Sequence, residues 1–237
     1  MTELLYLTDA YLREFTAIVT SIHEEENGVE LDRTAFYPGG GGQPNDIGKL
    51  ISTDGVEYPV TKCRRGNLHI IEGALPAIGT EVSGILDWSH RYRLMRTHTA
   101  MHILCGVVWR DYGASVTGGN MEPLKGRMDF EFERMQKELV REIEEKINRE
   151  VEAARDLTVA ILPREEAFQI PDLIRTKINL LPEGITEVRT VEIKGLDLQA
   201  DGGTHVNNTR EVGRMTITDY KSKGGINKRI YIELEGD

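Results

Sequence analysis

The chain has 237 residues, of which 39% are hydrophobic and 29% charged, and its formal net charge is −10 at pH 7. This is the composition of one large or two modest globular soluble domains, and it excludes wholesale disorder and a collagen-like fibre. No apolar stretch approaches the roughly 18 residues that a membrane-spanning helix needs. The N-terminus mixes charged with apolar residues, unlike a secretory signal. Two cysteines make no disulfide framework, so we expect a cytoplasmic protein.

The acidic balance, with a sequence pI of about 5.2, argues against a protein that coats nucleic acid nonspecifically. A local basic surface remains compatible with it, because phosphate binding depends on where the cations lie. Three basic clusters stand out: Lys62, Arg64 and Arg65; Arg91, Arg93 and Arg96; and Lys221, Lys223, Lys228 and Arg229. For each cluster alone, a solvated surface is the simpler interpretation.

The first part of the chain, residues 1–88, has the pattern of β-structure, with short runs of alternating residues between turn residues. The predicted strands cover residues 16–22, 28–31, 48–52, 55–60, 68–71 and 81–86. Several short strands at such spacing are typical of a small barrel or sandwich.

The periodicity changes at Ser89, a residue suited to cap the start of a helix. Apolar residues then recur at helical spacing from His90 to Asp111, and Gly113 ends the predicted helix. A second helix is predicted over residues 135–155, in an acidic stretch with the character of a solvated helix. Strands are predicted near residues 127–132, 157–162, 186–191, 213–219 and 228–234. Residues 89–237 are therefore predicted to form an α+β domain with helices on an antiparallel sheet.

The first candidate functional residues are His98 and His102, four positions apart on the first predicted helix. This spacing places both imidazoles on one face, where a single metal ion reaches both. A surface pair, or one core histidine with an unrelated neighbour, is at least as common. The sequence between them is not that of HExxH, so the general base of zinc peptidases is missing and peptidase chemistry is set aside.

Two further segments strengthen the case for a functional site. In LQADGGTH, Asp201 and His205 flank two glycines, although alone this is equally an Asp-Gly hairpin turn with an incidental histidine. In RTAFYPGGGGQP, four consecutive glycines let the backbone come close to a ligand, and their amides can hold an anionic or carbonyl oxygen. Alone, that segment would be only a flexible loop.

Together these segments resemble the editing module of alanyl-tRNA synthetases and, most closely, the free-standing AlaX-type alanyl-tRNA editing proteins. The resemblance covers nearly the whole chain and rests on FYPGGGGQP, RTHTAMHIL, DGGTHV and the C-terminal KGGINKRI. The chain starts at this module, so it is similar to the medium-length form. That form implies an N-terminal β-barrel, residues 1–88, followed by the editing domain, residues 89–237. It also implies one Zn²⁺ per chain, at His98, His102, His205 and position 201.

Position 201 departs from the family pattern, which usually reads Cys-x3-His. A carboxylate carries the same single negative charge as a thiolate, so Asp201 can ligate zinc at about 2.0–2.2 Å and move its preference toward harder ions. Alternatively, three histidines and a water hold the metal and Asp201 orients a histidine, or the metal is weakly held or lost. We favour ligation over orientation, and either over loss, because three histidines remain in register. Cys105, one helical turn beyond His102, is a substitute ligand only if Asp201 does not serve.

By resemblance, the expected reaction is hydrolysis, in trans and without ATP, of the ester joining a wrong amino acid to tRNA(Ala). Serine is the first expected substrate and glycine the second. An apolar pocket rejects one added hydroxyl poorly, whereas a site that hydrogen-bonds this hydroxyl discriminates better. The resemblance implies that Thr34 reads the serine hydroxyl and that Gln43 has a polar role beside the ester. Alone, Thr34 is equally a strand residue and Gln43 a loop residue that caps its own turn.

Further contacts with the substrate are expected from the glycine loop and from the C-terminal part of the chain. Gly40, Gly41 and Gly42 are expected to face the terminal adenosine or the ester. The remaining expected substrate contacts are Gly202 and Lys223. Candidate phosphate contacts for the acceptor end of tRNA(Ala), with affinity that falls with salt, are Arg91, Arg93, Lys221, Lys223, Lys228 and Arg229.

The role of zinc stays open at this point, since it either activates a water or, with four protein ligands, anchors the substrate or the pocket. No Ser-His-Asp or Cys-His set emerges from the sequence, so we expect attack by water rather than a covalent intermediate. Two other functions compete: a noncatalytic tRNA-binding module with a structural metal, and a metal-dependent esterase for small molecules. We expect no membrane contact, and a monomer in preference to an oligomer.

Overall fold

The computed structural model describes residues 2–174 and 184–236. The chain divides into two compact units, Met1–Tyr92 and Arg93–Asp237, and the division lies inside the long helix α1 (Trp88–Tyr112). The domain boundary that the sequence predicts, between residues 88 and 89, lies at the start of this helix and stays a prediction. None of the helices in the described ranges is both long and apolar enough to cross a membrane.

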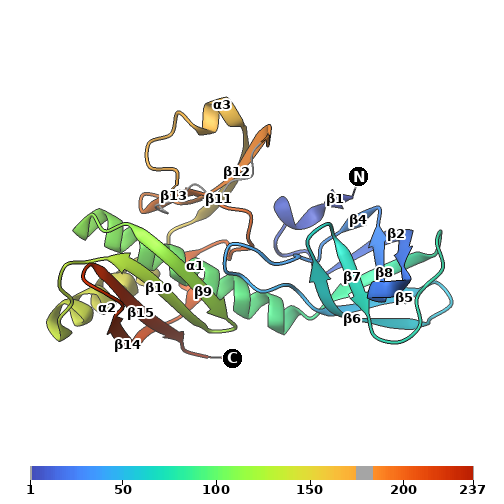
Figure 1. Cartoon of the computed structure of the whole chain (residues 1–237), viewed down its shortest axis with the longest axis horizontal. Coiled ribbons are helices and arrows are strands. Elements are labelled where there is room, and N and C mark those ends of the chain that lie inside the picture. Colours follow the sequence, from blue (N-terminus) through green and yellow to red (C-terminus); the bar gives the residue numbers. More distant parts are fainter. Residues whose placement is uncertain (1, 175–183, 237) are drawn as a thin grey trace. The chain divides into compact units, whose positions relative to one another are not determined.

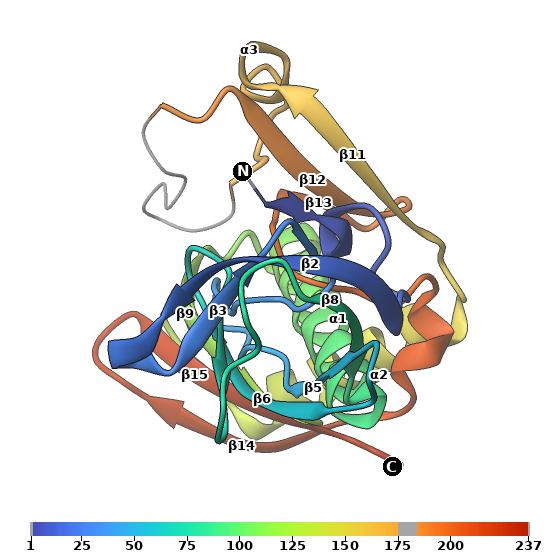
Figure 2. The ribbon, with the colours of Figure 1, turned by 90° about the vertical axis from the view of Figure 1, so that its right-hand side faces the viewer.

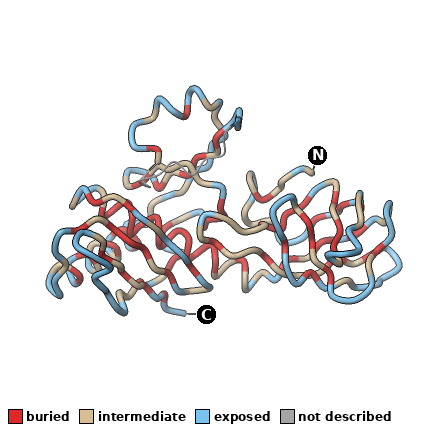
Figure 3. Tube along the Cα trace, viewed as in Figure 1, coloured by how far each residue is buried: buried red, intermediate tan, exposed pale blue. Residues whose placement is uncertain are grey.

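The first unit contains a closed antiparallel barrel with the strand order β2-β3-β7-β6-β5-β8 (Figure 1). Its strands are β2 (Glu14–His23), β3 (Gly28–Leu31), β5 (Gly48–Ser52), β6 (Glu57–Arg64), β7 (Leu68–Ile71) and β8 (Glu81–Leu86). Along β2 the buried residues are Phe15, Ala17 and Val19, because alternate side chains of a strand point to opposite faces. β8 shows the same alternation, and buried stretches of the other strands also contribute to the core of this unit (Figure 3). This confirms the predicted small barrel.

Four shorter elements of the first unit were not predicted. They are β1 (Glu3–Leu4), the 3-10 helices η1 (Leu5–Leu7) and η2 (Glu24–Glu26), and β4 (Arg33–Thr34). β1 and β4 pair in parallel, with Leu4 opposite Thr34. Strand β4 is therefore the element that positions Thr34.

The second unit is built on an antiparallel sheet of order β14-β15-β10-β9, which confirms the α+β prediction (Figures 1 and 2). The elements are β9 (Val116–Glu122), β10 (Lys125–Glu131), β14 (Met215–Ser222), β15 (Asn227–Leu234) and the helix α2 (Lys137–Glu152). Helix α1 approaches this sheet through Met101, which lies where a side chain at Gly119 or Gly126 would have to fit. Helix α2 contacts β14, where Asn148 Nδ2 donates to the Met215 carbonyl at 2.8 Å.

A second, three-stranded sheet has the order β11-β12-β13, and Figure 2 shows α3 at one end of the β11–β12 pair. Its elements are β11 (Leu157–Pro163), β12 (Glu187–Ile193) and β13 (Asp197–Ala200), with α3 (Arg164–Ala167) and η3 (Thr209–Val212) nearby in the chain. The sequence did not predict β9 or β13. β9 contains Gly118-Gly119-Asn120, a typical turn sequence, and β13 is only four residues long.

Two helix predictions need correction. Ser89 lies inside α1, and the start of the helix is capped by Asp87, whose Oδ1 accepts the His90 N–H at 3.0 Å. A carboxylate is an effective cap because it accepts a free N–H of the first turn. Helix α2 is not wholly solvated, since Val140, Ile143 and Ile147 form a buried stripe at helical spacing.

Candidate metal centre and glycine loop

The second unit brings together the four residues predicted to hold a metal. One ligand atom from each of His98, His102, Asp201 and His205 lies within 4.8 Å of the others. The two histidines on α1 are one turn apart, as their spacing predicted, with ring centroids 5.1 Å apart. Asp201 and His205 come from the segment that follows β13, and the rings of His98 and His205 stack at 4.2 Å. Three of the four residues are buried and Asp201 is half-buried.

The separations between these atoms can be compared with the edges of a zinc coordination tetrahedron. Zinc–ligand bonds of 2.0–2.2 Å place neighbouring ligand atoms about 3.4 Å apart. Asp201 Oδ2 lies 2.9 Å from His205 Nε2, and Asp201 Oδ1 lies 3.6 Å from His98 Nε2. These two values bracket the tetrahedral edge, whereas the ligand atoms of the whole cluster lie within 4.8 Å of one another, so the donor set can hold a zinc-sized ion once its atoms move closer together.

Asp197, at the start of β13, orients His102. Its Oδ2 lies 3.1 Å from His102 Nδ1 and also accepts a hydrogen bond from Gln199 Nε2 at 2.6 Å. A carboxylate at Nδ1 holds the proton on that nitrogen and leaves Nε2 free to act as a ligand. The sequence analysis missed Asp197 because it did not predict β13.

Gly106 makes the approach of Asp197 possible. It lies on α1 four residues after His102, hence on the same face of the helix. A Cβ at Gly106 would lie 2.9 Å from Leu196 Cγ and 3.0 Å from Asp197 Cβ. A glycine at this position was the available sequence clue that another segment packs closely beside His102.

Thr99 links α1 to the segment that carries His205. Thr99 Oγ1 lies 3.1 Å from His205 Nδ1 and accepts the Val206 N–H at 3.3 Å. His205 therefore resembles His102: in both residues a side-chain oxygen lies at Nδ1, which leaves Nε2 available as a metal ligand. This is the arrangement expected of metal-ligating histidines.

Burial controls the protonation of the cluster. It lowers the pKa of His98 well below its ordinary value and that of His205 to about 4, so both imidazoles are neutral. Burial also acts to lower the pKa of His102, but the hydrogen bond that its Nδ1 donates to Asp197 and the negative charge of that carboxylate outweigh burial and raise this pKa. Burial opposes the charged form of Asp201, yet the surrounding histidines hold the pKa of this carboxyl well below its usual range.

Asp201 is part of an irregular segment and not of a hairpin turn. The Asp201 Oδ2 accepts the Gly203 N–H at 2.8 Å. The backbone of Asp201 also pairs with Arg189 of β12: the Asp201 N–H donates to the Arg189 carbonyl, and Arg189 Nη1 donates to the Asp201 carbonyl at 2.9 Å. Gly202 is exposed, and a side chain there would meet nothing within 4 Å. Cys105 is outside the cluster of described ligand atoms, and its sulfur accepts from Gln199 Nε2 at 3.4 Å.

In the first unit, the glycine loop is closed at its ends by reciprocal bonds between Tyr37 and Asp46. Asp46 N–H donates to the Tyr37 carbonyl at 2.9 Å, and Tyr37 N–H donates to Asp46 Oδ2 at 2.6 Å. The loop folds back on itself because Gly40 and Gln43 exchange two backbone hydrogen bonds. All four glycines of the loop have positive φ, between 56° and 152°, which side chains rarely tolerate.

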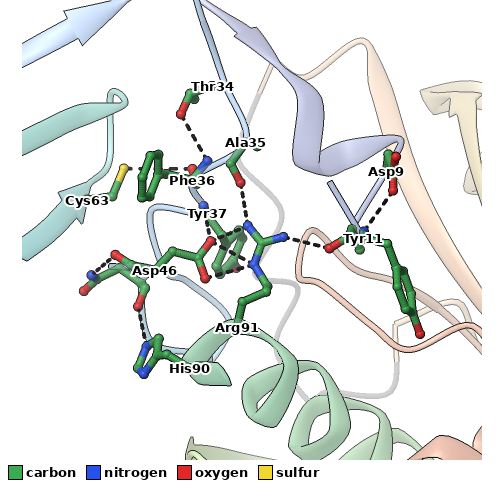
Figure 4. A network of polar contacts seen from close by, with 12 residues as sticks. Asp9, Tyr11, Thr34, Ala35, Phe36, Tyr37, Asp46, Cys63, His90 and Arg91 are labelled. Atoms are coloured by element: carbon green, nitrogen blue, oxygen red, sulfur yellow. Dashed lines mark hydrogen bonds and ion pairs between the residues drawn. The ribbon is translucent and has the colours of Figure 1, made fainter. Parts of the chain in front are cut away.

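A buried arginine anchors this loop (Figure 4). Arg91 and Asp46 are both buried, and the guanidinium forms a bidentate ion pair with the carboxylate. Arg91 also donates to the Ala10 carbonyl at 2.9 Å and to the Ala35 carbonyl. Beside it, His90 Nε2 lies 3.1 Å from the Asn45 carbonyl. The prediction that Arg91 contacts phosphate is therefore wrong, because its charge is used inside the protein.

The predicted pocket residues of this unit are more buried than the sequence suggested. Thr34 is 0% and Gln43 is 3% exposed, whereas Gly41 is exposed and Gly40 and Gly42 are half-buried. The relation of these residues to the histidine cluster of the other unit stays a prediction.

Several of the predicted phosphate contacts are also engaged within the protein. Lys228 is buried and donates to the carbonyls of Gly224 and Gly225, and Arg229 forms a bidentate pair with Asp129. Lys223, which follows β14, is exposed. The Nε of Arg93 is buried and has no hydrogen-bond partner among the described residues. Of these cations, Lys223 thus keeps a charge that is accessible from solvent.

Sequence comparisons show that nearly the whole chain is similar to known proteins. Residues 188–231 match the family described as the threonyl and alanyl tRNA synthetase second additional domain. The chain is 43% identical over 243 residues to the alanyl-tRNA editing protein AlaX-M of Saccharolobus solfataricus, with 99% of this chain and 100% of that protein covered. This chain belongs to the AlaX-type family of alanyl-tRNA editing proteins.

Other AlaX-type and synthetase relatives agree with this assignment. The alanyl-tRNA editing protein AlaX-M of Methanosarcina acetivorans is 38% identical to this AlaX-type chain, with 99% of both chains covered. The alanine–tRNA ligase of Ignicoccus hospitalis is 38% identical over 91% of this chain and 24% of that protein. The family predicted from the sequence is confirmed.

Proposed function

We propose that this chain is a trans-acting hydrolase that removes a wrong amino acid from tRNA(Ala), serine first and glycine second. Relatives that match nearly its full length are named alanyl-tRNA editing proteins, which supports the reaction class. The observation that carries the proposal is the cluster of His98, His102, Asp201 and His205, in a unit that contains the match to a synthetase domain. The four residues of the cluster could hold a metal ion, and the names of the relatives imply that the protein carries out an editing reaction.

We propose Zn²⁺ as the ion, one per chain, with Asp201 as a ligand. The carboxylate keeps the single negative charge of a thiolate and favours harder cations. With four protein ligands, a bound zinc supplies a fixed positive charge that holds the substrate or the shape of the pocket. Asp197 and Thr99 keep His102 and His205 aimed at the ion.

The glycine loop and the β4 strand are proposed to hold the aminoacyl end. In this proposal Thr34 reads the serine hydroxyl, and Gln43 lies beside the ester. The amides of Gly40, Gly41 and Gly42 face the terminal adenosine or the ester carbonyl, and the attacking nucleophile is water. Arg91 and Asp46 do not touch substrate but fix both ends of the loop.

Two further residues of the second unit are proposed to contact the tRNA acceptor end. The open space around Gly202, next to Asp201, allows a ligand to approach the cluster. Lys223 is exposed and suits a phosphate contact. We also propose that the protein acts without ATP, as a monomer in the cytoplasm, where a reducing environment suits the two free, buried cysteines.

The test is to incubate the zinc-loaded protein separately with seryl-tRNA(Ala) and alanyl-tRNA(Ala) and to follow release of the amino acid. We expect release of serine and retention of alanine. His98→Ala removes this activity, and the matched control His23→Ala, at an exposed histidine paired with Glu30, leaves it unchanged.

Each rival function has its own outcome in this experiment. Salt-sensitive tRNA binding with no release from either tRNA would contradict the hydrolase and support a binding module with a structural metal. Turnover of small esters that uncharged tRNA does not inhibit would instead indicate a small-molecule esterase.

A further inference from the structure

Thr34 is hydrogen-bonded to a buried histidine, His69. Thr34 lies on β4 and His69 on β7, and both are 0% exposed. Thr34 Oγ1 and His69 Nε2 are 2.8 Å apart. The histidine ring also packs edge-on against Phe36, with centroids 5.4 Å apart. The pair is therefore a fixed part of the interior of the first unit.

The other ring nitrogen of His69 determines the direction of this hydrogen bond. Nδ1 lies 3.2 Å from the carbonyl of Val29, and a carbonyl can only accept, so Nδ1 carries the proton. Burial lowers the pKa of His69 to about 4, so the ring is neutral and its Nε2 bears a lone pair. Thr34 must therefore donate its hydroxyl proton to Nε2.

The Thr34 oxygen has a second partner. It accepts the N–H of Phe36 at 3.1 Å. A hydroxyl has one proton and two lone pairs. The Thr34 proton points at His69 Nε2, and one lone pair accepts the Phe36 N–H. The hydrogen bonds within the described residues therefore leave one lone pair of the Thr34 oxygen, and a lone pair can only accept.

We propose that His69 is a positioning residue that fixes the Thr34 hydroxyl as a hydrogen-bond acceptor, so that the site selects an aminoacyl group able to donate. This rests on the proposed function. The serine hydroxyl donates to the remaining lone pair, whereas the side chains of glycine and alanine have no donor. Without His69, the Thr34 hydroxyl is no longer held in one orientation, so its hydrogen bond with the serine hydroxyl is less well ordered and the preference for serine over glycine weakens.

The functional test compares His69→Gln with His69→Leu. Gln carries a carbonyl that can accept the Thr34 proton, whereas Leu is apolar and of similar size. A hydrogen bond contributes about 0.5–1.5 kcal/mol, or roughly 2- to 13-fold. We expect the ratio of kcat/KM for seryl- over glycyl-tRNA(Ala) to fall by about that factor in His69→Leu and to be retained in His69→Gln.

Controls separate selectivity from folding and show whether substrate reaches this site. Thermal unfolding and zinc content identify variants that fail to fold. Thr34→Val, which keeps the shape and removes the hydroxyl, is expected to lower the same ratio, and Thr34→Ser to retain it. An unchanged ratio in both Thr34→Val and His69→Leu would overturn the proposal.

A second readout does not depend on turnover. Nitrogen-15 NMR of the imidazole distinguishes a protonated Nδ1 from a protonated Nε2. We expect the Nδ1–H tautomer at neutral pH and a shift of the Nε2 resonance in Thr34→Val. An Nε2–H tautomer would overturn the proposal even in an active enzyme. Failure of the wild-type protein to release serine, with the Nδ1–H tautomer present, would instead count against the proposed function.

Discussion

Each of the two units has a carboxylate at its candidate functional site, Asp46 and Asp201, and the two carboxylates are balanced differently. Asp46, in the first unit, pairs with the guanidinium of Arg91, a permanent cation that is itself fully buried. Asp201, in the second unit, lies among histidines, and burial keeps two of them, His98 and His205, neutral. The guanidinium of Arg189, a permanent cation, lies 3.9 Å from Asp201 Oδ2 at its Nη1.

The difference separates a structural carboxylate from one suited to a ligand. A buried charge needs a partner of opposite sign, because removing it from water is costly. Arg91 provides that partner within the chain, and the result is a rigid anchor for the glycine loop. At Asp201, the neutral imidazoles of His98 and His205 supply no charge, and the Arg189 guanidinium lies 3.9 Å from the carboxylate without direct contact with it. Asp201 is therefore less fully balanced within the chain than Asp46 and better suited to bind a cation.

The largest expected effect is the loss of the internal cation in the first unit. Arg91→Met leaves Asp46 as a buried, unpaired charge and is expected to lower the free energy of unfolding by about 3–5 kcal/mol. Denaturant unfolding measures this. The control Arg33→Met, at an exposed arginine near Glu3, is expected to change stability by about 1 kcal/mol or less. If Arg91→Met and Arg33→Met lowered the free energy of unfolding equally, Arg91 would not be the buried partner that balances Asp46, and the contrast with Asp201 would be wrong.

The buried, neutral His69 makes the stability of the protein depend on pH. Its pKa is about 4 when folded and 6.5 in the unfolded chain, so between these values only the unfolded chain binds the proton. The contribution is complete above pH 6.5 and is lost as the pH falls to about 4, a change of about 3 kcal/mol. We expect His69→Gln to lose stability less steeply over this range. Parallel curves for the two proteins would exclude a neutral buried His69.

In the second unit, Asp197→Asn tests whether the histidines are oriented for an ion. The amide cannot hold the Nδ1 proton of His102 as a carboxylate does, so we expect zinc affinity to fall by about 10- to 100-fold. Competition with a chromophoric chelator measures the affinity. Asp219→Asn, at an exposed acidic residue paired with Lys221, is the matched control and should have no effect.

A smaller effect is expected from Gly106→Ala. The new Cβ would come within 3.0 Å of Asp197 Cβ, which displaces Asp197 from His102. We expect a loss of zinc affinity of up to about 10-fold, below that of Asp197→Asn. Gly225→Ala, at an exposed glycine with open space around it and no left-handed backbone, controls for a general effect of the added methyl group. A loss larger than that of Asp197→Asn would indicate a wider disruption.

The sequence was sufficient to predict the barrel and, together with the family resemblance, to predict that the four cluster residues come together. Alternation identifies strands such as β2 and β8, and the spacing of His98 and His102 places both on one helix face. The pairing of this helix with Asp201 and His205 came from the family resemblance. No local pattern specifies which distant segment packs on a helix.

What the sequence could not predict depends on contacts between distant segments. β13 is too short for a recognisable period, so Asp197 had no visible connection to His102. Arg91 looked like a surface cation because its partner, Asp46, is 45 residues away in the chain. The contact between His69 and Thr34 could not be predicted for the same reason, since the two residues are 35 positions apart in the chain.

The most direct test of the central claim is zinc binding by the wild-type protein, Asp201→Ala and Asp201→Cys. If a metal ion balances Asp201 as a ligand, the wild-type chain binds one zinc. Asp201→Cys then keeps the ion, because a thiolate restores the negative ligand, and Asp201→Ala loses affinity by about 100-fold or more. Unchanged zinc occupancy and affinity in Asp201→Ala would contradict the account and remove Asp201 from the ligand set.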